Sequence, residues 1–328
     1  MSTYLNPSRI PLSLAVFLAT DNYDYESNTI SATGLIRPLR QIVLARRVPA
    51  DQRPVEIGSL VKSRIGSALH DGIERAWIHN KDQAMEALGY PEHVIQRVKV
   101  NPEPDELEEG DIPVYLEKRS RRQVGRYVVS GKFDFVAEGR VEDFKSTGTF
   151  SWTNERASKD KELSYKLQGS IYRWLNPDII TDDELAINFI FTDWSYGFAK
   201  ANPNYPPEAT AQKLIPLMSI SETDNWIRQK LDLLDQYLDA PESEIPLCTD
   251  ADLWRSAPEF KYYKNPDKRN RSTKNFDNYA DAFQRLQDDG GTGVVIEKPG
   301  TVSACKYCPA FAVCTQKDDL LARGELQM

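Results

Sequence analysis

The hydrophobic residues of this chain recur with a helical period over three long segments. Residues 57–88, 158–175 and 221–238 each place apolar side chains at intervals of three and four. In the first segment these are Leu60, Val61, Ile65, Leu69, Ile73, Ala76 and Trp77. This spacing is typical of a helix with one apolar face, so we predict three long helices.

A different pattern, rich in β-branched and aromatic residues, fills residues 126–147, RYVVSGKFDFVAEGRVEDFKST. Two such runs flank Gly139-Arg140, which predicts a β-hairpin with its turn centred there. In that register residue 134 faces 145 and residue 136 faces 143. Residues 185–191, LAINFIF, are continuously apolar, as in a buried strand. We expect this strand to extend the sheet that contains the hairpin.

The hairpin carries charged residues among its apolar ones. Side chains two apart in a strand share a face, so Asp134, Asp143 and Lys145 are predicted on one side and Glu142 on the other. Burying carboxylates is costly unless they are paired or hold a metal, which indicates a divalent-metal site. For the hairpin alone, a solvated face is the alternative.

Two helices bring further polar residues. His70 lies on the first helix, although a lone histidine there is more often structural. Gln168 and Tyr172 on the second are four apart and share a face, where Tyr172 could equally pack in the core.

The four cysteines are unevenly spaced. Cys305, Cys308 and Cys314 form a Cys-x2-Cys-x5-Cys group, and Cys248 stands apart from them. Two thiolates separated by two residues can bind one metal, and the fourth cysteine would complete a shell of four. Unrelated buried thiols are the alternative.

Composition narrows the classes of function. The chain has 328 residues, 40% hydrophobic and 27% charged, with a net charge of −8. This charge argues against a uniformly basic nucleic-acid surface but not against a local basic channel. No apolar run could span a bilayer and no signal peptide is evident, so we expect a cytoplasmic protein without membrane contact. In that compartment cysteines are more often metal ligands or free thiols than disulfides.

One local basic segment is residues 261–274, KYYKNPDKRNRSTK. Its six basic residues, one acidic residue and two tyrosines are suited to a single-stranded or frayed nucleic-acid end, which offers phosphates and bases together. A solvated loop is the alternative.

Taken in chain order, these motifs resemble a known family. His70 on a helix, Gly131-x-x-Asp134, Asp143-x-Lys145 and Gln168-x-x-x-Tyr172 are similar to the motifs of RecB-like PD-(D/E)XK nucleases. The resemblance covers roughly residues 31–314, with about a dozen positions carrying it. It implies an α/β fold with a restriction-endonuclease-like core, a mixed twisted sheet flanked by helices.

The resemblance also implies roles for the site residues. Mg²⁺ or Mn²⁺ would be held by His70, Asp134 and Asp143. Lys145 would position the water or stabilise developing charge, and Gln168 and Tyr172 would orient the substrate strand.

The C-terminal cysteines are similar to those of the iron–sulfur branch of this family, of the type often found in phages and prophages. That branch usually has its fourth cysteine near the N-terminus, whereas Arg37-Pro-Leu-Arg-Gln here has none and Cys248 follows the nuclease motifs. The resemblance implies a [4Fe-4S] cluster at Cys248, Cys305, Cys308 and Cys314, with Zn²⁺ as the alternative.

We therefore expect three segments: an N-terminal docking segment 1–55, a nuclease core 56–240 and a cysteine-cluster module 241–328 packed on the core. The expected function is a metal-dependent DNA exonuclease that acts on ends or single-stranded regions. A flap-type endonuclease is the first alternative. A catalytically silent DNA-binding or scaffold protein with the same fold is an alternative of another class.

Overall fold

The computed structural model describes residues 4–20, 29–49 and 55–327, without the side chains of residues 155–160. It comprises two compact units, one formed by residues 1–37 and 54–233 and the other by residues 38–53 and 234–328. The expected division at 55/56 and 240/241 stays a prediction. The two units do not follow these boundaries, because residues 38–53 group with the C-terminal part of the chain.

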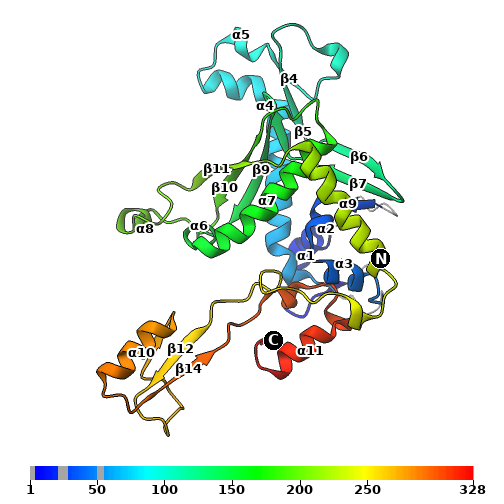
Figure 1. Cartoon of the computed structure of the whole chain (residues 1–328). Helices are drawn as coiled ribbons and strands as arrows, with labels where there is room; N and C mark the ends of the chain where they lie inside the picture. The colour runs from blue at the N-terminus through cyan, green and yellow to red at the C-terminus, as the bar shows by residue number, and fades with distance from the viewer. Residues whose placement is uncertain (1–3, 21–28, 50–54, 328) are drawn as a thin grey trace. The chain divides into compact units, whose positions relative to one another are not determined.

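The first unit is built on a six-stranded mixed sheet in the order β11-β10-β9-β8-β5-β4 (Figure 1). Its strands are β4 (Val98–Val100), β5 (Ile112–Leu116), β8 (Phe135–Ala137), β9 (Arg140–Thr147), β10 (Glu184–Phe191) and β11 (Thr210–Pro216). The β4–β5 and β9–β10 pairs are parallel and the others antiparallel. The prediction that residues 185–191 extend the hairpin sheet is confirmed, since β10 pairs with β9.

The hairpin register differs from the predicted one by two residues. Val136 faces Val141 and Ala137 faces Arg140, so the two-residue turn is Glu138-Gly139 rather than Gly139-Arg140. Both turn residues have positive φ, 49° and 80°, as tight hairpin turns of this type require. Glycine adopts this backbone at its second position without strain. A shift of two residues preserves strand parity, so Asp134 and Asp143 still share a face.

The predicted first strand of the hairpin is not continuous. β7 (Tyr127–Lys132) ends before Phe133-Asp134, and the chain resumes as β8 in the other sheet. β7 belongs to a three-stranded sheet in the order β2-β7-β6, with β2 (Thr29–Ser31) and β6 (Arg119–Val124). The adjacent chain segment breaks beside it, because Glu117-Lys118 separates β5 from β6. Two chain segments therefore pass together from one sheet to the other.

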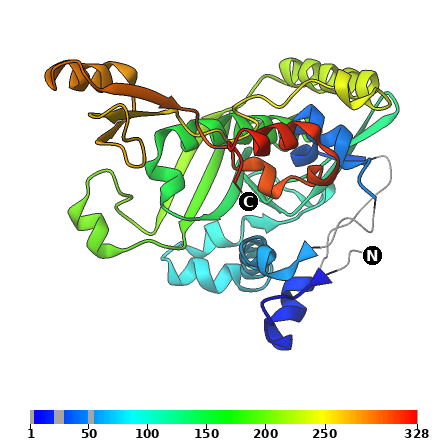
Figure 2. The same ribbon diagram turned by 90° about the horizontal axis from the view of Figure 1, so that it is seen from below.

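The three predicted helices are confirmed as α4 (Val61–Ala87), α7 (Glu155–Leu175) and α9 (Ile220–Tyr237). A 3₁₀ turn, Ile57–Leu60, precedes α4. On one face of the sheet, Trp77 of α4 packs on Phe135, which contacts Phe144 of β9. On the opposite face lies α7 (Figures 1 and 2), whose Gln168 side chain reaches Asp143 of β9. Mixed α/β architecture with helices flanking a mixed sheet is thus observed.

Short elements complete this unit. They are β1 (Tyr4–Leu5), α1 (Leu12–Ala19), α2 (Ala32–Ile36), β3 (Val55–Glu56), α5 (Glu92–Ile95), a 3₁₀ turn at Pro104–Glu106, α6 (Phe150–Thr153) and α8 (Tyr196–Ala201).

The second unit combines α3 with the C-terminal part of the chain. It contains α3 (Leu39–Ala45), β12 (Glu259–Tyr263), β13 (Lys274–Phe276), α10 (Tyr279–Asp288), β14 (Val294–Lys298), α11 (Thr315–Ala322) and 3₁₀ turns at Glu242–Glu244, Ala304–Tyr307 and Phe311–Val313. Arg47, which follows α3, donates to the carbonyls of Tyr237, Leu238 and Ala240 at the end of α9. These bonds satisfy carbonyls that the helix end leaves without partners. Among the described residues, no helix has the length and apolar content needed to cross a bilayer.

Candidate functional site

The site forms where two chain segments, Glu117-Lys118 and Phe133-Asp134, pass from one sheet to the other. The backbone N–H of Glu117 donates to the Asp134 carbonyl at 3.1 Å, and that of Phe133 donates to the Lys118 carbonyl at 3.3 Å. Glu117 takes a left-handed backbone, with φ of 50°. This break in the strand turns the Glu117 carboxylate beside that of Asp134.

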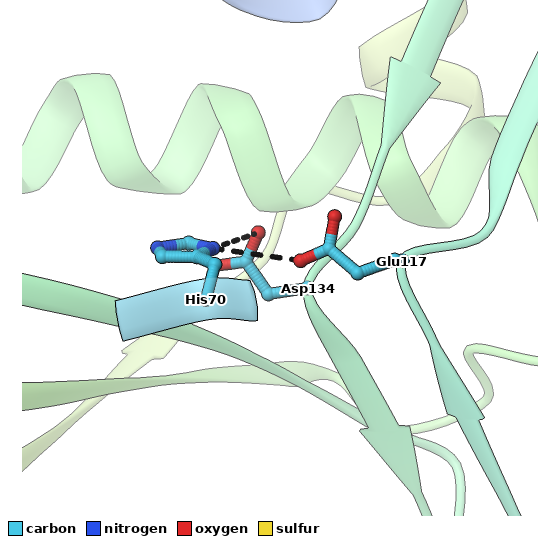
Figure 3. Close-up of side chains that lie close together, drawn as sticks. All are labelled: His70, Glu117 and Asp134. Carbon is cyan, nitrogen blue, oxygen red and sulfur yellow. Dashed lines mark ion pairs between the residues drawn. The ribbon is translucent and has the colours of Figure 1, made fainter. Parts of the chain in front are cut away.

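His70 of α4 completes the group (Figure 3). Its Nδ1 atom lies 3.4 Å from Asp134 Oδ1 and 3.5 Å from Glu117 Oε1. The three candidate ligand atoms lie within 4.8 Å of one another. Among the described residues this is the one His, Cys, Asp and Glu group that meets this limit. All three side chains are at most one-quarter exposed.

The second ring nitrogen of His70 shows how this site can hold a cation. His70 Nε2 lies 3.2 Å from the carbonyl oxygen of Phe144. A carbonyl only accepts, so Nε2 carries a proton, and in the neutral ring Nδ1 is left as a lone pair facing the two carboxylates. A backbone partner of this kind commonly orients metal-binding histidines. The donor set of one imidazole nitrogen and two carboxylates therefore fits a divalent metal.

Without a metal, a proton binds Nδ1 of His70, which faces the two carboxylates. Hydrogen bonds to Asp134 and Glu117 raise the pKa of His70 to about 10, although burial acts in the opposite direction. Burial would raise the pKa of Glu117, but hydrogen bonds to His70 and Lys132 outweigh it and hold that pKa below its usual value. The two carboxylates thus favour a positive charge at this point.

Glu117 was not predicted from the sequence. It is the only acidic residue between positions 112 and 133, and it stands between the apolar strand IPVYL and the basic run KRSRR. A lone carboxylate at such a boundary is a signal that could have identified it.

Asp143 lies deeper and pairs with other residues. Its side chain is 3% exposed, with Lys145 Nζ 2.6 Å from Oδ2 and the amide nitrogen of Gln168 3.1 Å from Oδ1. Burial raises the pKa of Asp143 to about 6 despite the opposing charge of Lys145, and the charge of Asp134 adds to the rise. Burial alone would lower the pKa of Lys145, but the attraction of Asp143 outweighs it and raises that pKa. Asp143 as a metal ligand stays a prediction.

Gln168 joins Asp143 to Tyr172. Its amide nitrogen also donates to the Tyr172 hydroxyl at 2.8 Å, which confirms that the two residues share a helix face. Tyr172 is 5% exposed, and burial together with the charges of Asp143 and Asp134 raises the pKa of its hydroxyl well above the usual value. The expected orientation of the substrate strand by these residues stays a prediction.

Close packing of α7 on β7 requires a glycine at position 131, in the Gly-x-x-Asp motif. A Cβ at Gly131 would lie 2.7 Å from a side-chain carbon of Leu175 and 2.9 Å from one of Tyr172. Only glycine lets α7 approach β7 this closely without displacing these side chains.

Glu142 lies on the other face of β9, as predicted. Its carboxylate accepts hydrogen bonds from Arg140 at 3.2 Å and Asn188 at 2.7 Å. Neither partner belongs to the site around Asp143.

In the second unit, the four cysteines are not joined in disulfides. Cys248 and Cys305 pack against a buried cluster of Leu253, Val302, Leu320 and Leu326. Burial, with smaller contributions from the charges of Asp252, Cys314 and Cys308, raises the pKa of Cys248 to about 12. Burial, together with Cys308 and Cys314, also raises the pKa of Cys305, so the four thiols belong to one neighbourhood. No three of them come within 4.8 Å of one another among the described residues.

A buried arginine contacts this cysteine group. Arg40, 3% exposed, places Nε 3.5 Å from Cys314 Sγ and pairs with Glu242. Arg40 comes from the segment Arg37-Pro-Leu-Arg-Gln, in which the family resemblance would place a cysteine. A set of four thiols with a cationic N–H donor suits a thiolate-ligated metal or iron–sulfur centre. The presence of such a centre and its identity both stay predictions.

No known family's sequence model matches the chain, and no curated protein matches its sequence. Among solved structures, SSO0001 is 16% identical with a TM-score of 0.38, over 65% of this chain and 80% of that one. A phage-related exonuclease from Haemophilus somnus 129PT is 14% identical with a TM-score of 0.29, over 66% of this chain and 96% of that one. At these TM-scores neither likeness assigns a fold or an activity to this chain.

Proposed function

We propose that this protein is a metal-dependent deoxyribonuclease that hydrolyses phosphodiester bonds at DNA ends. The observation that carries the proposal is the convergence of His70, Glu117 and Asp134 on one cation site, next to the buried Asp143–Lys145 pair. The choice of DNA and of its ends follows from the order of motifs shared with RecB-like nucleases.

The residues present match the needs of a hard divalent ion. Carboxylate oxygens and one imidazole nitrogen, from Glu117, Asp134 and His70, are suitable ligands for Mg²⁺ or Mn²⁺, with Asp143 as a further predicted ligand. An ion bound there would polarise the scissile phosphate and lower the pKa of a water molecule.

Lys145 would act on the reacting phosphate. Its ammonium is held by Asp143, and the ring of Tyr165 lies 5.6 Å from Nζ. The side chain remains 28% exposed, so it can donate to an attacking water or to a phosphate oxygen. Gln168 would be a positioning residue that holds Asp143 through its hydrogen bond.

The proposed cofactor of the second unit is a [4Fe-4S] cluster at Cys248, Cys305, Cys308 and Cys314, with Zn²⁺ as the alternative. Such a group would link the C-terminal residues to the preceding chain and need not take part in redox chemistry. Anaerobic purification followed by iron, sulfide and zinc analysis decides between the two. Colourless protein that contains zinc would contradict the iron–sulfur assignment.

The activity is tested on end-labelled linear, closed circular and flapped DNA with Mg²⁺ and with Mn²⁺. Degradation of linear DNA with circular DNA left intact supports the exonuclease. Cutting confined to flaps identifies a structure-specific endonuclease, and no cleavage of any substrate identifies a silent DNA-binding protein.

Three substitutions test the site. Asp134→Ala, Asp143→Ala and Lys145→Ala are each expected to abolish degradation while the protein stays folded by circular dichroism. Full activity in any of them would reject this site.

A further inference from the structure

A small subdomain of the second unit carries features that the proposed nuclease site does not use. It consists of residues 259–298, in which α10 packs on the three-stranded sheet β13-β12-β14, and we call it the arm (Figure 1). The arm contains the basic segment 261–274 singled out in the sequence.

The hairpin loop of the arm concentrates positive charge. Five basic side chains in and beside the loop between β12 and β13 are exposed: Lys264, Lys268, Arg269, Arg271 and Lys274. The loop has one acidic residue, Asp267, and none of the five cations lies within 4.0 Å of a carboxylate among the described residues. In a chain with a net charge of −8, this local excess favours an anionic partner.

The tyrosines of the segment do not face this partner. Tyr262 is fully buried, and Tyr263 is 8% exposed. The Tyr262 hydroxyl donates to Asp289, at the C-terminal end of α10, at 2.9 Å. Neither tyrosine is therefore available to stack on bases. Tyr262 points to the face of β12 on which α10 packs, whereas Tyr263 points to the opposite face and is also buried.

A different aromatic pair is exposed. Tyr279 and Phe283, one turn apart on α10, are 54% and 42% exposed. Their rings are stacked, with centroids 5.7 Å apart and planes at 19°. The ring of Phe260 on β12 supports Tyr279 from the side at 6.0 Å. Two large exposed rings held in this way offer a flat apolar surface on an otherwise polar helix.

The pairing of β12 with β13 fixes the spacing of the two features. Phe260, which contacts Tyr279, faces Phe276, whereas Tyr262 faces Lys274 at the start of the loop. Lys264 follows Phe260 by four positions, or about 13 Å at the usual rise of a β-strand. An extended nucleic-acid strand of a few nucleotides can span that length.

We propose that the arm binds single-stranded nucleic acid, with bases stacking on Tyr279 and Phe283 and phosphates pairing with the cationic loop. A single strand presents unpaired base faces and phosphates together, which is the combination that the arm complements. A duplex hides its base faces and would meet only the cations. This binding requires no hydrolysis, so it goes beyond the proposed nuclease activity and can be tested apart from it.

The test measures binding of fluorescent oligothymidylate to the full-length protein by anisotropy, in EDTA so that no metal-dependent cleavage occurs. The loop variant combines Lys268→Gln, Arg269→Gln and Arg271→Gln. Its control combines Lys62→Gln, Lys99→Gln and Lys298→Gln, which removes the same charge from exposed sites outside the loop.

The loop variant is expected to bind at least about 10-fold more weakly and to lower the log–log salt slope by about 2, since each lost phosphate contact removes roughly 0.7. The control is expected to stay within about twofold of the wild type. Equal weakening of both variants would overturn the proposal, because the loop would then have no special role.

Two further comparisons test the stacking. Tyr279→Leu and Phe283→Leu are each expected to weaken binding by at least about fivefold with the salt slope unchanged. Wild-type affinity in both variants would overturn the proposal, as would a duplex of equal length that binds as tightly as the single strand. Thermal melting of each variant verifies that the fold is retained.

Discussion

The backbone N–H of Glu117 donates a 3.1 Å hydrogen bond to the carbonyl oxygen of Asp134, at the level where both of their strands break. This bond aligns the two breaks, and the two carboxylates emerge together toward His70 of α4. The cation site therefore forms because both chain segments leave one sheet and enter the other at this point. Unbroken β-strands would not supply the same geometry.

Gln168 is expected to matter for catalysis through Asp143. Gln168→Leu removes the hydrogen bonds to Asp143 and Tyr172 and leaves the carboxylate free to turn. We expect kcat for DNA degradation to fall about 10- to 100-fold with little change in KM, as for other residues that orient metal-site side chains. Gln96→Leu, at an exposed position, is the matched control. A change confined to KM would instead place Gln168 in direct contact with substrate.

Gly131→Ala is expected to separate α7 from β7. The added methyl group would overlap Tyr172 and Leu175, so we expect a loss of roughly 1–3 kcal/mol in the free energy of unfolding. Gly72→Ala is the control, because nothing lies within 4 Å of a Cβ there and alanine favours the helix. Chemical denaturation of both variants measures the difference. Equal stability of Gly131→Ala and wild type would show that the packing at this point is loose.

His70 is expected to make the metal-free protein sensitive to high pH. Its pKa of about 10 lies above the ordinary value near 6.5. The stabilisation from imidazolium is therefore fully present below pH 6.5 and is lost as the pH rises through 10. Melting temperatures of wild type and His70→Gln in EDTA should differ most below pH 6.5 and converge above pH 10. A difference that does not vary with pH would contradict this.

The cysteine group is expected to act as one unit. Replacing any one of Cys248, Cys305, Cys308 and Cys314 by serine should remove more than half of the bound iron and sulfide and lower the melting temperature. Loss of metal in only the three C-terminal variants would exclude Cys248 as the fourth ligand. Metal content is measured on anaerobically purified protein, with melting followed by circular dichroism.

Much of the fold could be predicted from local patterns, because helix period and strand parity are local properties. The three long helices and the β9–β10 neighbourhood were predicted correctly. The turn was misplaced by one residue, which shifts the pairing register by two, and Asp134 and Asp143 kept their common face because a shift of two does not change parity.

The rest depends on tertiary contacts. Glu117 reaches the site only because its strand breaks with a left-handed residue, which no periodic pattern signals. The break at Asp134 is hidden in the same way, since residues 126–137 have continuous strand composition. Tyr262 looks accessible in a basic segment but is covered once α10 packs on β12.

The most direct test of the account pairs Mn²⁺ binding with DNA degradation in two variants. Glu117→Gln removes a charge from the cation site, and Glu142→Gln makes the same change on the opposite face of β9. Calorimetry measures the affinity for Mn²⁺, and end-labelled linear DNA measures the rate.

We predict that Glu117→Gln weakens Mn²⁺ binding at least about 10-fold and abolishes degradation, whereas Glu142→Gln retains both. Wild-type affinity and rate in Glu117→Gln would contradict the central claim that His70, Glu117 and Asp134 form the catalytic metal site.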